Sequence, residues 1–338
     1  MPGESAQQAV RIASEHLKSG RYDQAIAELK KALARDPRSP TAHMLLGFAY
    51  RAQGSYEMIG EAKAELRQAL ALDPNLHLAR FYLARVYLDL GRPDSARQEL
   101  ETALRAAPKV PQFLALLAEV HRVSGDPAEA IRLSTQALET DPSFAVAHYY
   151  RGMSYLDLKR KEEAIQEIEK ALISGQMLPD IYLALGSIHL EAGRPGKAIG
   201  WLEKAIALDP GKAEARLKLA RGYRLQGQLD RALDQLRQVA PERQSFLSSA
   251  YFQELHSEAL FEMGSTLQAQ GETSQAIEAY RKAIELNDRN GPAHQQLATL
   301  LLNQAQYEQA RPHVERAKEL GTPVDAALLD RHRGKQPR

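Results

Sequence analysis

The chain has 338 residues with almost balanced charge, 44 Lys and Arg against 43 Asp and Glu, and a net charge of +1. This balance provides no general electrostatic attraction to nucleic acid or to an anionic membrane. The sequence contains no cysteine, which excludes disulfides, thiolate metal sites and cysteine nucleophiles and leaves the redox compartment open.

Small residues recur along the chain at a nearly fixed interval. The nine positions are Ala13, Gly47, Ala84, Ala118, Gly152, Gly186, Ala220, Gly264 and Ala298. Six of the eight intervals are 34 residues long, one is 37 and one is 44. A fixed period of this length is typical of stacked helical repeats, which contact only their neighbours. The sequence therefore predicts nine repeats.

The stretch from Leu76 to Pro108 shows how one repeat is built. Leu83 and Tyr87 share one face of a first helix, which ends at Gly91 because glycine adopts a positive φ without steric cost. A second helix opens at Pro93, where a missing N–H does little harm. Its apolar residues recur at helical spacing on an inner face. Each repeat is thus predicted to be two amphipathic helices joined by a tight turn.

The same columns recur in register through the other repeats. The turn glycines are Gly20, Gly54, Gly91, Gly125, Gly193, Gly227 and Gly271, and Lys159 and Ala305 take this place in two repeats. The small residues that open the second helices are Ala25, Ala62, Ala96, Ala130, Ala164, Ala198, Ala232, Ala276 and Ala310. This pattern resembles the tetratricopeptide repeat family across roughly residues 6–322. The resemblance implies an all-α, right-handed superhelical solenoid of antiparallel helix pairs, with first helices lining the concave face.

Two departures from the period suggest how the array is organised. Residues 5–240 hold repeats one to seven, in which three extra residues before Ala62 predict a longer second helix. A ten-residue insertion follows Ala240 and is the candidate hinge, and the helical pattern of 245–260 predicts an early start to the next first helix. Repeats eight and nine occupy 241–322. Residues 323–338 are expected to form a capping helix and a disordered tail.

The columns expected on the concave face collect aromatic, methionine and arginine side chains. The candidate peptide-binding groove comprises Met44, Phe48, Arg51, Phe81, Tyr82, Arg85, Arg122, Tyr149, Tyr150, Met153, Arg221 and Arg224. Aromatic residues and arginine dominate binding energy at interfaces, and methionine adapts its shape to a partner. The groove is predicted to bind an apolar or amphipathic segment of another protein, its arginines pairing with acidic groups. Alternatively, these side chains only pack between neighbouring first helices.

A second basic patch lies on the first helix of the seventh repeat. It consists of Lys212, Arg216, Lys218, Arg221 and Arg224, with the acidic residues Glu203, Glu214 and Asp230 nearby in sequence. One interpretation is a contact for an acidic peptide or a phosphate. The favoured interpretation is a solvated helix face that the neighbouring carboxylates neutralise.

No segment of domain size remains outside the repeats to hold an active site. We therefore expect a non-enzymatic interaction scaffold with no catalytic residue, cofactor or metal site. The histidines at repeat positions, His16, His43, His121, His148, His189 and His294, are expected to serve in packing. Alternatives are a binder of nucleic acid or another anionic ligand through the groove arginines, and an accessory module of a larger enzyme complex.

The expected partner is thus another protein, with nucleic acid disfavoured and the oligomeric state open. The N-terminal sequence lacks the basic and apolar regions of a secretory signal, and no run of residues is long and apolar enough for a membrane span. A cytoplasmic location is the simplest expectation. A periplasmic or secreted location, after removal of a signal peptide, stays open.

Overall fold

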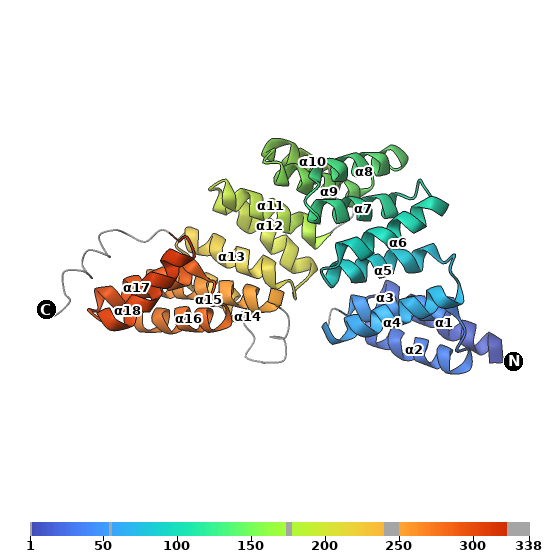
Figure 1. The fold of residues 1–338 in the computed structure, drawn as a ribbon, viewed down its shortest axis with the longest axis horizontal. Helices are drawn as coiled ribbons and strands as arrows, with labels where there is room; N and C mark the ends of the chain where they lie inside the picture. Colours follow the sequence, from blue (N-terminus) through green and yellow to red (C-terminus); the bar gives the residue numbers. More distant parts are fainter. Residues whose placement is uncertain (1, 54–55, 174–177, 240–249, 323–338) are drawn as a thin grey trace. The chain divides into compact units, whose positions relative to one another are not determined.

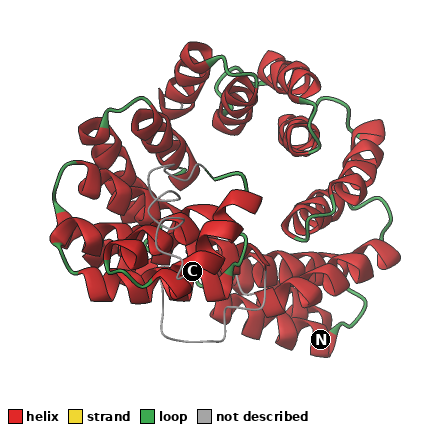
Figure 2. Ribbon diagram, turned by 60° about the vertical axis from the view of Figure 1, so that its left-hand side comes forward, coloured by secondary structure: helices red, strands yellow, loops and turns green. Residues whose placement is uncertain are grey.

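The computed structural model describes residues 2–53, 56–173, 178–239 and 250–322. Within these ranges every regular element is an α-helix, and Figure 2 shows helices joined by short loops. The chain divides into two compact units, Met1–Gln176 and Met177–Arg338. In each unit, successive helices pack as pairs and each pair packs on the next. The predicted all-α solenoid of antiparallel helix pairs is confirmed.

Figure 1 follows the helices in chain order through the two units. Unit 1 contains α1 (Pro2–Lys18), α2 (Tyr22–Arg35), α3 (Pro40–Ala52), α4 (Tyr56–Leu72), α5 (His77–Asp89), α6 (Pro93–Ala106), α7 (Pro111–Val123), α8 (Pro127–Thr140), α9 (Ala145–Asp157) and α10 (Lys161–Ile173). Unit 2 contains α11 (Pro179–Glu191), α12 (Pro195–Leu208), α13 (Ala213–Leu225), α14 (Leu229–Val239), α15 (Ala250–Gln270), α16 (Thr273–Leu286), α17 (Gly291–Asn303) and α18 (Tyr307–Glu319). Odd-numbered helices are the first helices of the repeats.

The turn between the two helices of a repeat keeps one backbone conformation, whichever residue occupies it. Gly91 has a φ of 65°, and the amide of the following Arg92 donates to the carbonyl of Tyr87 at 2.8 Å. Lys159 and Ala305 occupy the same place with φ values of 62° and 58°. Side chains with a Cβ rarely adopt this left-handed conformation. The stacking of the repeats therefore imposes it on these two residues.

Alanine at the start of each second helix allows close helix packing, as the sequence predicted. Ala25, Ala62, Ala96, Ala130, Ala164, Ala198, Ala232, Ala276 and Ala310 are all fully buried. Where the small residue of the first helix is a glycine, a side chain of the second helix lies so close that no Cβ would fit between them. A Cβ added to Gly264 would lie 2.6 Å from Cε1 of the fully buried Tyr280. Small residues thus set the separation of the helices within a repeat.

The two departures from the period lengthen helices. The second helix α4 has 17 residues where α2 has 14, which confirms the first prediction. The first helix α15 has 21 residues where α13 has 13, so it does start early, at Ala250. Helix packing in unit 2 continues across the insertion, since Nε2 of His256 lies 2.9 Å from the carbonyl oxygen of Val239. Residues 240–249 and 323–338, with the predicted hinge insertion, capping helix and tail, lie outside the described residues.

Candidate functional site

Aromatic side chains of three first helices in unit 1 form a chain of ring contacts. Phe48 on α3 lies 4.9 Å from Tyr82 on α5, measured between ring centroids. Phe81 lies 5.4 Å from Tyr82 and 5.7 Å from Phe113 on α7. Phe113 is buried, whereas the other three rings are partly exposed. The cluster therefore rests on a buried ring and keeps part of its apolar surface open.

The remaining aromatic and methionine candidates divide between surface and core. Tyr149 and Tyr150 on α9 lie 5.4 Å apart and are partly exposed, as is Met153 one turn later. Met44 is only 6% exposed and belongs to the hydrophobic core. Its side chain therefore packs in the core and offers almost no contact area to a partner.

Two of the unit 1 arginines are occupied by ion pairs within the chain. Arg51 Nε lies 2.6 Å from Asp89 Oδ2, which joins α3 to the first helix of the next repeat. Arg122 holds Glu119 with two hydrogen bonds, at 2.7 and 2.8 Å, and reaches Asp157 on α9 at 3.0 Å. Its hydrogen bonds to Glu119 raise the pKa of Arg122. These arginines therefore cross-link neighbouring repeats.

The arginines of unit 2 are likewise paired. Arg224 Nη2 lies 2.9 Å from Glu262 Oε2 on α15, and Glu262 is 5% exposed. Arg221 is exposed, and its Nε lies 4.0 Å from the same carboxylate. In the second basic patch, Lys218 lies 3.7 Å from Glu214 and Lys212 lies 2.6 Å from Asp180. The patch is thus largely neutralised, through Glu214 as expected.

The other two carboxylates expected beside this patch have different partners. Glu203 accepts a hydrogen bond from Tyr223 at 2.6 Å, and Asp230 accepts one from Gln270 at 2.8 Å. The acids that do pair with Arg224 and Lys212 come from neighbouring first helices. Pairing between repeats, which sequence proximity does not reveal, therefore neutralises most of the patch.

Arg85 differs from these arginines. Within the part of the chain that the structure describes, no carboxylate or carbonyl oxygen accepts a hydrogen bond from its guanidinium, which lies 5.9 Å from the Phe81 ring centroid. Burial, followed by the nearby charge of Arg51, lowers the pKa of Arg85. Burial also raises the pKa of the neighbouring Tyr82. Arg85 is therefore a cation held in a partly desolvated place without a matched anion.

Arg85 lines a cavity of about 460 Å³, which we name the Arg85 pocket. Its walls come from the first helices α3, α5, α7 and α9, from the turn after α5 and from the first residue of α6. They are formed by Arg51, Arg85, Leu88, Asp89, Gly91, Pro93, Leu116, Glu119, Val123 and Tyr150. Val123 is 48% exposed at this wall. The pocket thus combines one unmatched cation with apolar side chains.

Of the histidines predicted to serve in packing, His148 and His294 are buried and the other four are partly exposed, and several of the six bridge the two helices of a repeat. His148 on α9 is 8% exposed, and its Nδ1 lies 2.9 Å from Glu167 Oε2 on α10. Its Nε2 lies 3.0 Å from the carbonyl oxygen of Pro142, six residues earlier. The same bridge recurs in other repeats as His43–Glu65, Arg80–Glu99, Arg216–Gln235 and His294–His313. We name this contact the intra-repeat bridge.

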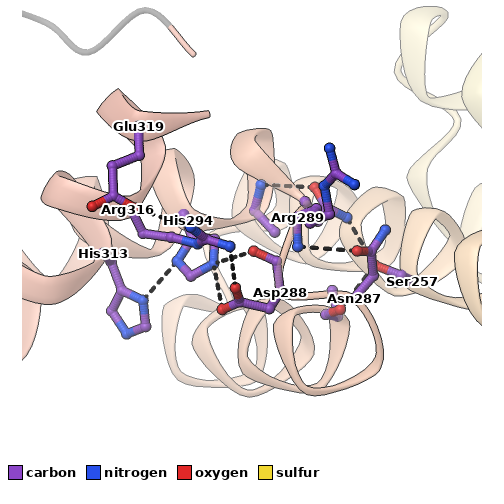
Figure 3. Close-up of polar contacts among 11 residues, drawn as sticks. Ser257, Asn287, Asp288, Arg289, His294, His313, Arg316 and Glu319 are labelled. Carbon is purple, nitrogen blue, oxygen red and sulfur yellow. Dashed lines mark hydrogen bonds and ion pairs between the residues drawn. The ribbon is translucent and has the colours of Figure 1, made fainter. Parts of the chain in front are cut away.

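The bridge of the ninth repeat has a histidine on both helices. Figure 3 shows His294 between His313 and the loop residue Asp288. The two Nδ1 atoms lie 3.0 Å apart, and His294 Nε2 lies 3.2 Å from the carbonyl oxygen of Asp288. Arg316 holds the Asp288 carboxylate at 2.5 Å. Burial lowers the pKa of both histidines.

The sequence reasoning missed the acidic partners of the groove arginines. Asp89 and Asp157 each lie five residues after the small residue of their repeat, and Arg51 and Arg122 lie four residues after theirs. In a stack, these columns of adjacent repeats meet. An acidic residue in the following repeat was therefore a usable signal that the arginine before it is neutralised.

Within the described ranges, no three His, Asp or Glu side chains form a group that could hold a metal ion. None of the helices described combines the length and apolar character that crossing a bilayer requires.

The fold and this surface define the class of protein. The chain is an α-helical repeat protein, because its helix pairs stack on one another around a periodic core. Proteins of this class bind partners on extended surfaces. The tetratricopeptide repeat family models match residues 57–120 and 189–258, 115–180, 257–290 and 279–311, and a TPR repeat model matches 13–54. The chain belongs to the tetratricopeptide repeat family, whose arrays are protein-interaction scaffolds.

Individual relatives are distant. The TPR repeat-containing protein YpiA of Bacillus subtilis (strain 168) is 26% identical over 201 residues, which cover 59% of this chain and 46% of YpiA. The protein O-mannosyl-transferase TMTC1 of Homo sapiens is 27% identical over 203 residues, covering 52% of this chain and 23% of TMTC1. The match thus spans less than half the length of either relative. A chain of the APC/C hetero-tetramer Cut9–Hcn1 is similar in fold, with a TM-score of 0.66, 14% identity and coverage of 97% of this chain and 76% of that one.

Proposed function

We propose that the first-helix face of unit 1 docks a segment of another protein, extended or helical, and that the chain is a non-catalytic scaffold. One observation carries this proposal: the partly exposed ring contacts of Phe48, Tyr82 and Phe81 lie in the same first helices that form the Arg85 pocket. Aromatic side chains supply large contact area at low cost in conformational entropy, and they dominate binding energy at interfaces. We name this face, α3, α5, α7 and α9, the docking face.

The charges favour a polypeptide partner over nucleic acid. Phosphate recognition requires several cations free to replace counterions. Arg51, Arg122 and Arg224 are instead bound to carboxylates of neighbouring repeats. The net charge of +1 adds no long-range attraction. Nucleic acid binding through the groove arginines is therefore the weaker proposal, and membership of a larger enzyme assembly would use the same docking face.

The test is selection of binding peptides from a random displayed library against the full chain. Selected peptides should bind, and hydrogen exchange in their presence should slow on the docking-face helices α3, α5, α7 and α9. Replacing Phe48, Phe81 and Tyr149 together by alanine should weaken binding by about tenfold or more, because truncating a central aromatic contact costs about 2 kcal/mol. Failure to select any binder, or protection confined to other helices, would refute the proposal.

A matched control separates binding from folding. Trp201 and its partner ring Tyr182 lie 6.0 Å apart on α12 and α11 of unit 2, helices that are not part of the docking face. Trp201→Ala should leave peptide affinity unchanged. The triple alanine variant should keep its helical circular dichroism, since these three side chains are partly exposed.

A further inference from the structure

The docking face carries one cation, Arg85, that forms no ion pair within the described residues, and Asp89, whose charge acts on it, is held by Arg51. A guanidinium has five N–H donors, and a buried or half-buried charge without a partner is costly. Arg51 and Arg122 satisfy theirs with Asp89, Glu119 and Asp157. Arg85 donates to no carboxylate or carbonyl of the described residues, although it lies in the same pocket wall.

The side chains around Arg85 strengthen any bond that its guanidinium makes to an external anion. Three aromatic side chains, Phe81, Tyr82 and Tyr150, lie around the guanidinium, and they limit its contact with water. Low local dielectric strengthens any hydrogen bond that the guanidinium makes there. A ligand with a planar anionic group could accept two of its N–H donors side by side, which is the strongest geometry available to arginine.

The rest of the pocket wall selects the class of anion. Asp89 and Glu119 also line the pocket, each already held by an arginine. A doubly charged phosphate would bring two negative charges close to these two carboxylates. A single carboxylate brings one, which Arg85 compensates. The apolar atoms of Leu88, Leu116 and Val123 favour an apolar neighbour beside that group.

We propose that the Arg85 pocket binds one aspartate or glutamate side chain of the docked segment, with an apolar residue beside it. This inference rests on the proposed function, and it names the feature of the partner that the docking face recognises. Of the arginines expected to pair with acidic groups, Arg85 is the one in unit 1 that is available to do so.

The test is a double-mutant cycle on peptides selected against the full chain. The first expected result is enrichment of one acidic position flanked by apolar residues. Two synthetic peptides are then compared, identical except for Glu or Gln at that position, on the unaltered chain and on Arg85→Gln. A charge-assisted pair is worth about 1.5 to 3 kcal/mol, so Arg85→Gln should weaken the Glu peptide about tenfold or more and the Gln peptide less than about threefold.

Two controls test whether a loss of affinity comes from the Arg85 charge and not from a change in folding. Arg67→Gln, on the exposed side of α4, should change neither affinity. Arg85→Gln should unfold at an unchanged or higher temperature, because it removes a charge without a partner. A lower unfolding temperature would reveal an internal role for Arg85 and overturn the inference.

The remaining outcomes separate this inference from the function on which it rests. Selected peptides without an acidic position, or an equal loss for both peptides on Arg85→Gln, would overturn the Arg85 assignment while docking stands. Displacement of the Glu peptide by an equal concentration of single-stranded oligonucleotide would overturn it in favour of phosphate. Failure to select any peptide would overturn the docking proposal and this inference together.

Discussion

His148 and Glu167 join the two helices of the fifth repeat through a buried contact of 2.9 Å between Nδ1 and Oε2. The same carboxylate accepts hydrogen bonds from Arg151 at 2.6 and 2.8 Å, and Lys170 reaches its other oxygen at 2.8 Å. The column of Arg151 holds Ile, Leu or Met in each of the other eight repeats. This arginine is therefore tolerated in the fifth repeat because Glu167 compensates its charge.

Removing the Glu167 charge should destabilise the fifth repeat. Glu167→Gln leaves Arg151 partly buried without its anion, and breaking one partner of a buried pair costs about 3 kcal/mol. The measurement is hydrogen exchange of α9 and α10, since a repeat array need not unfold in two states. Lys170→Gln is the control, because Lys170 is 51% exposed and its loss should have little effect. Equal protection in Glu167→Gln and the unaltered chain would contradict the prediction.

The same network should make the fifth repeat acid-sensitive in a defined window. Burial raises the pKa of Glu167, but hydrogen bonds from His148, Lys170 and Arg151 outweigh it and lower the pKa from 4.5 to about 2. The unfolded chain therefore binds the proton more readily, and stability is present above pH 4.5 and lost as the pH falls toward 2. The shift corresponds to about 3 kcal/mol. Exchange of α10 amides measured across this range should show the loss, which Glu167→Gln should abolish.

The ninth repeat should lose stability at milder acidity, for a geometric reason. His294 Nε2 donates to the carbonyl oxygen of Asp288, so its Nδ1 must accept from His313. Protonation of His294 turns that acceptor into a donor and sets two N–H groups against each other. Because burial lowers the pKa of both histidines, stability is present above about pH 6.5 and is lost as the pH falls through their folded values. Arg281 and Arg316 add repulsion to the protonated pair, and Asp288 opposes it.

Replacing His313 by glutamate, the residue that stands at the matching place of the fifth repeat, should remove this acid sensitivity. His313→Glu recreates the His148–Glu167 bridge, in which a carboxylate accepts from the imidazole. Protection of the α17 and α18 amides against hydrogen exchange, followed from neutral pH to mild acid, should fall in the unaltered chain and be retained in the variant. His313→Gln controls for loss of one titrating ring. An identical acid response of all three proteins would show that the bridge does not govern it.

Glycine at the two irregular turns should stabilise the chain. Lys159 and Ala305 hold positive φ values that cost a residue with a Cβ about 1 kcal/mol. Lys159→Gly and Ala305→Gly should each return most of this cost, less the extra freedom that glycine gives the unfolded chain. Thermal unfolding followed by circular dichroism gives the measurement. Gly227→Ala, at a φ of 74° with no atom close to the new Cβ, should shift the midpoint down by a similar amount.

The glycine beneath Tyr280 should tolerate alanine only when the ring is removed. Gly264→Ala places a Cβ 2.6 Å from the ring, and overpacking of a core typically costs about 1 to 3 kcal/mol. Gly264→Ala combined with Tyr280→Leu recreates the buried Ala84–Leu100 pair of the third repeat. Urea unfolding of the single and double variants should give a favourable coupling between the two changes. Strictly additive effects would argue against the contact.

Much of the fold could be predicted from the sequence because its determinants are local and periodic. The turn at Gly91 requires a positive φ, and the alanine at Ala96 faces the first helix of its own repeat. Lys159 broke the glycine column, yet the flanking helices were recognisable without it. The site was less predictable. Met44 and Phe48 belong to neighbouring groove columns, but only the packing of α3 shows that Met44 is buried and Phe48 partly exposed.

The chain's order of small, apolar and turn residues determined by itself that this protein is a stack of helix pairs, since each helix pair is specified by residues within one period. Only the tertiary structure decided which cations remain available. Arg51 and Arg85 are both groove candidates in the sequence, in different columns of their repeats, but the first meets Asp89 of the next repeat and the second meets aromatic rings. That difference depends on how side chains of adjacent repeats approach, and charge pairing falls steeply with distance.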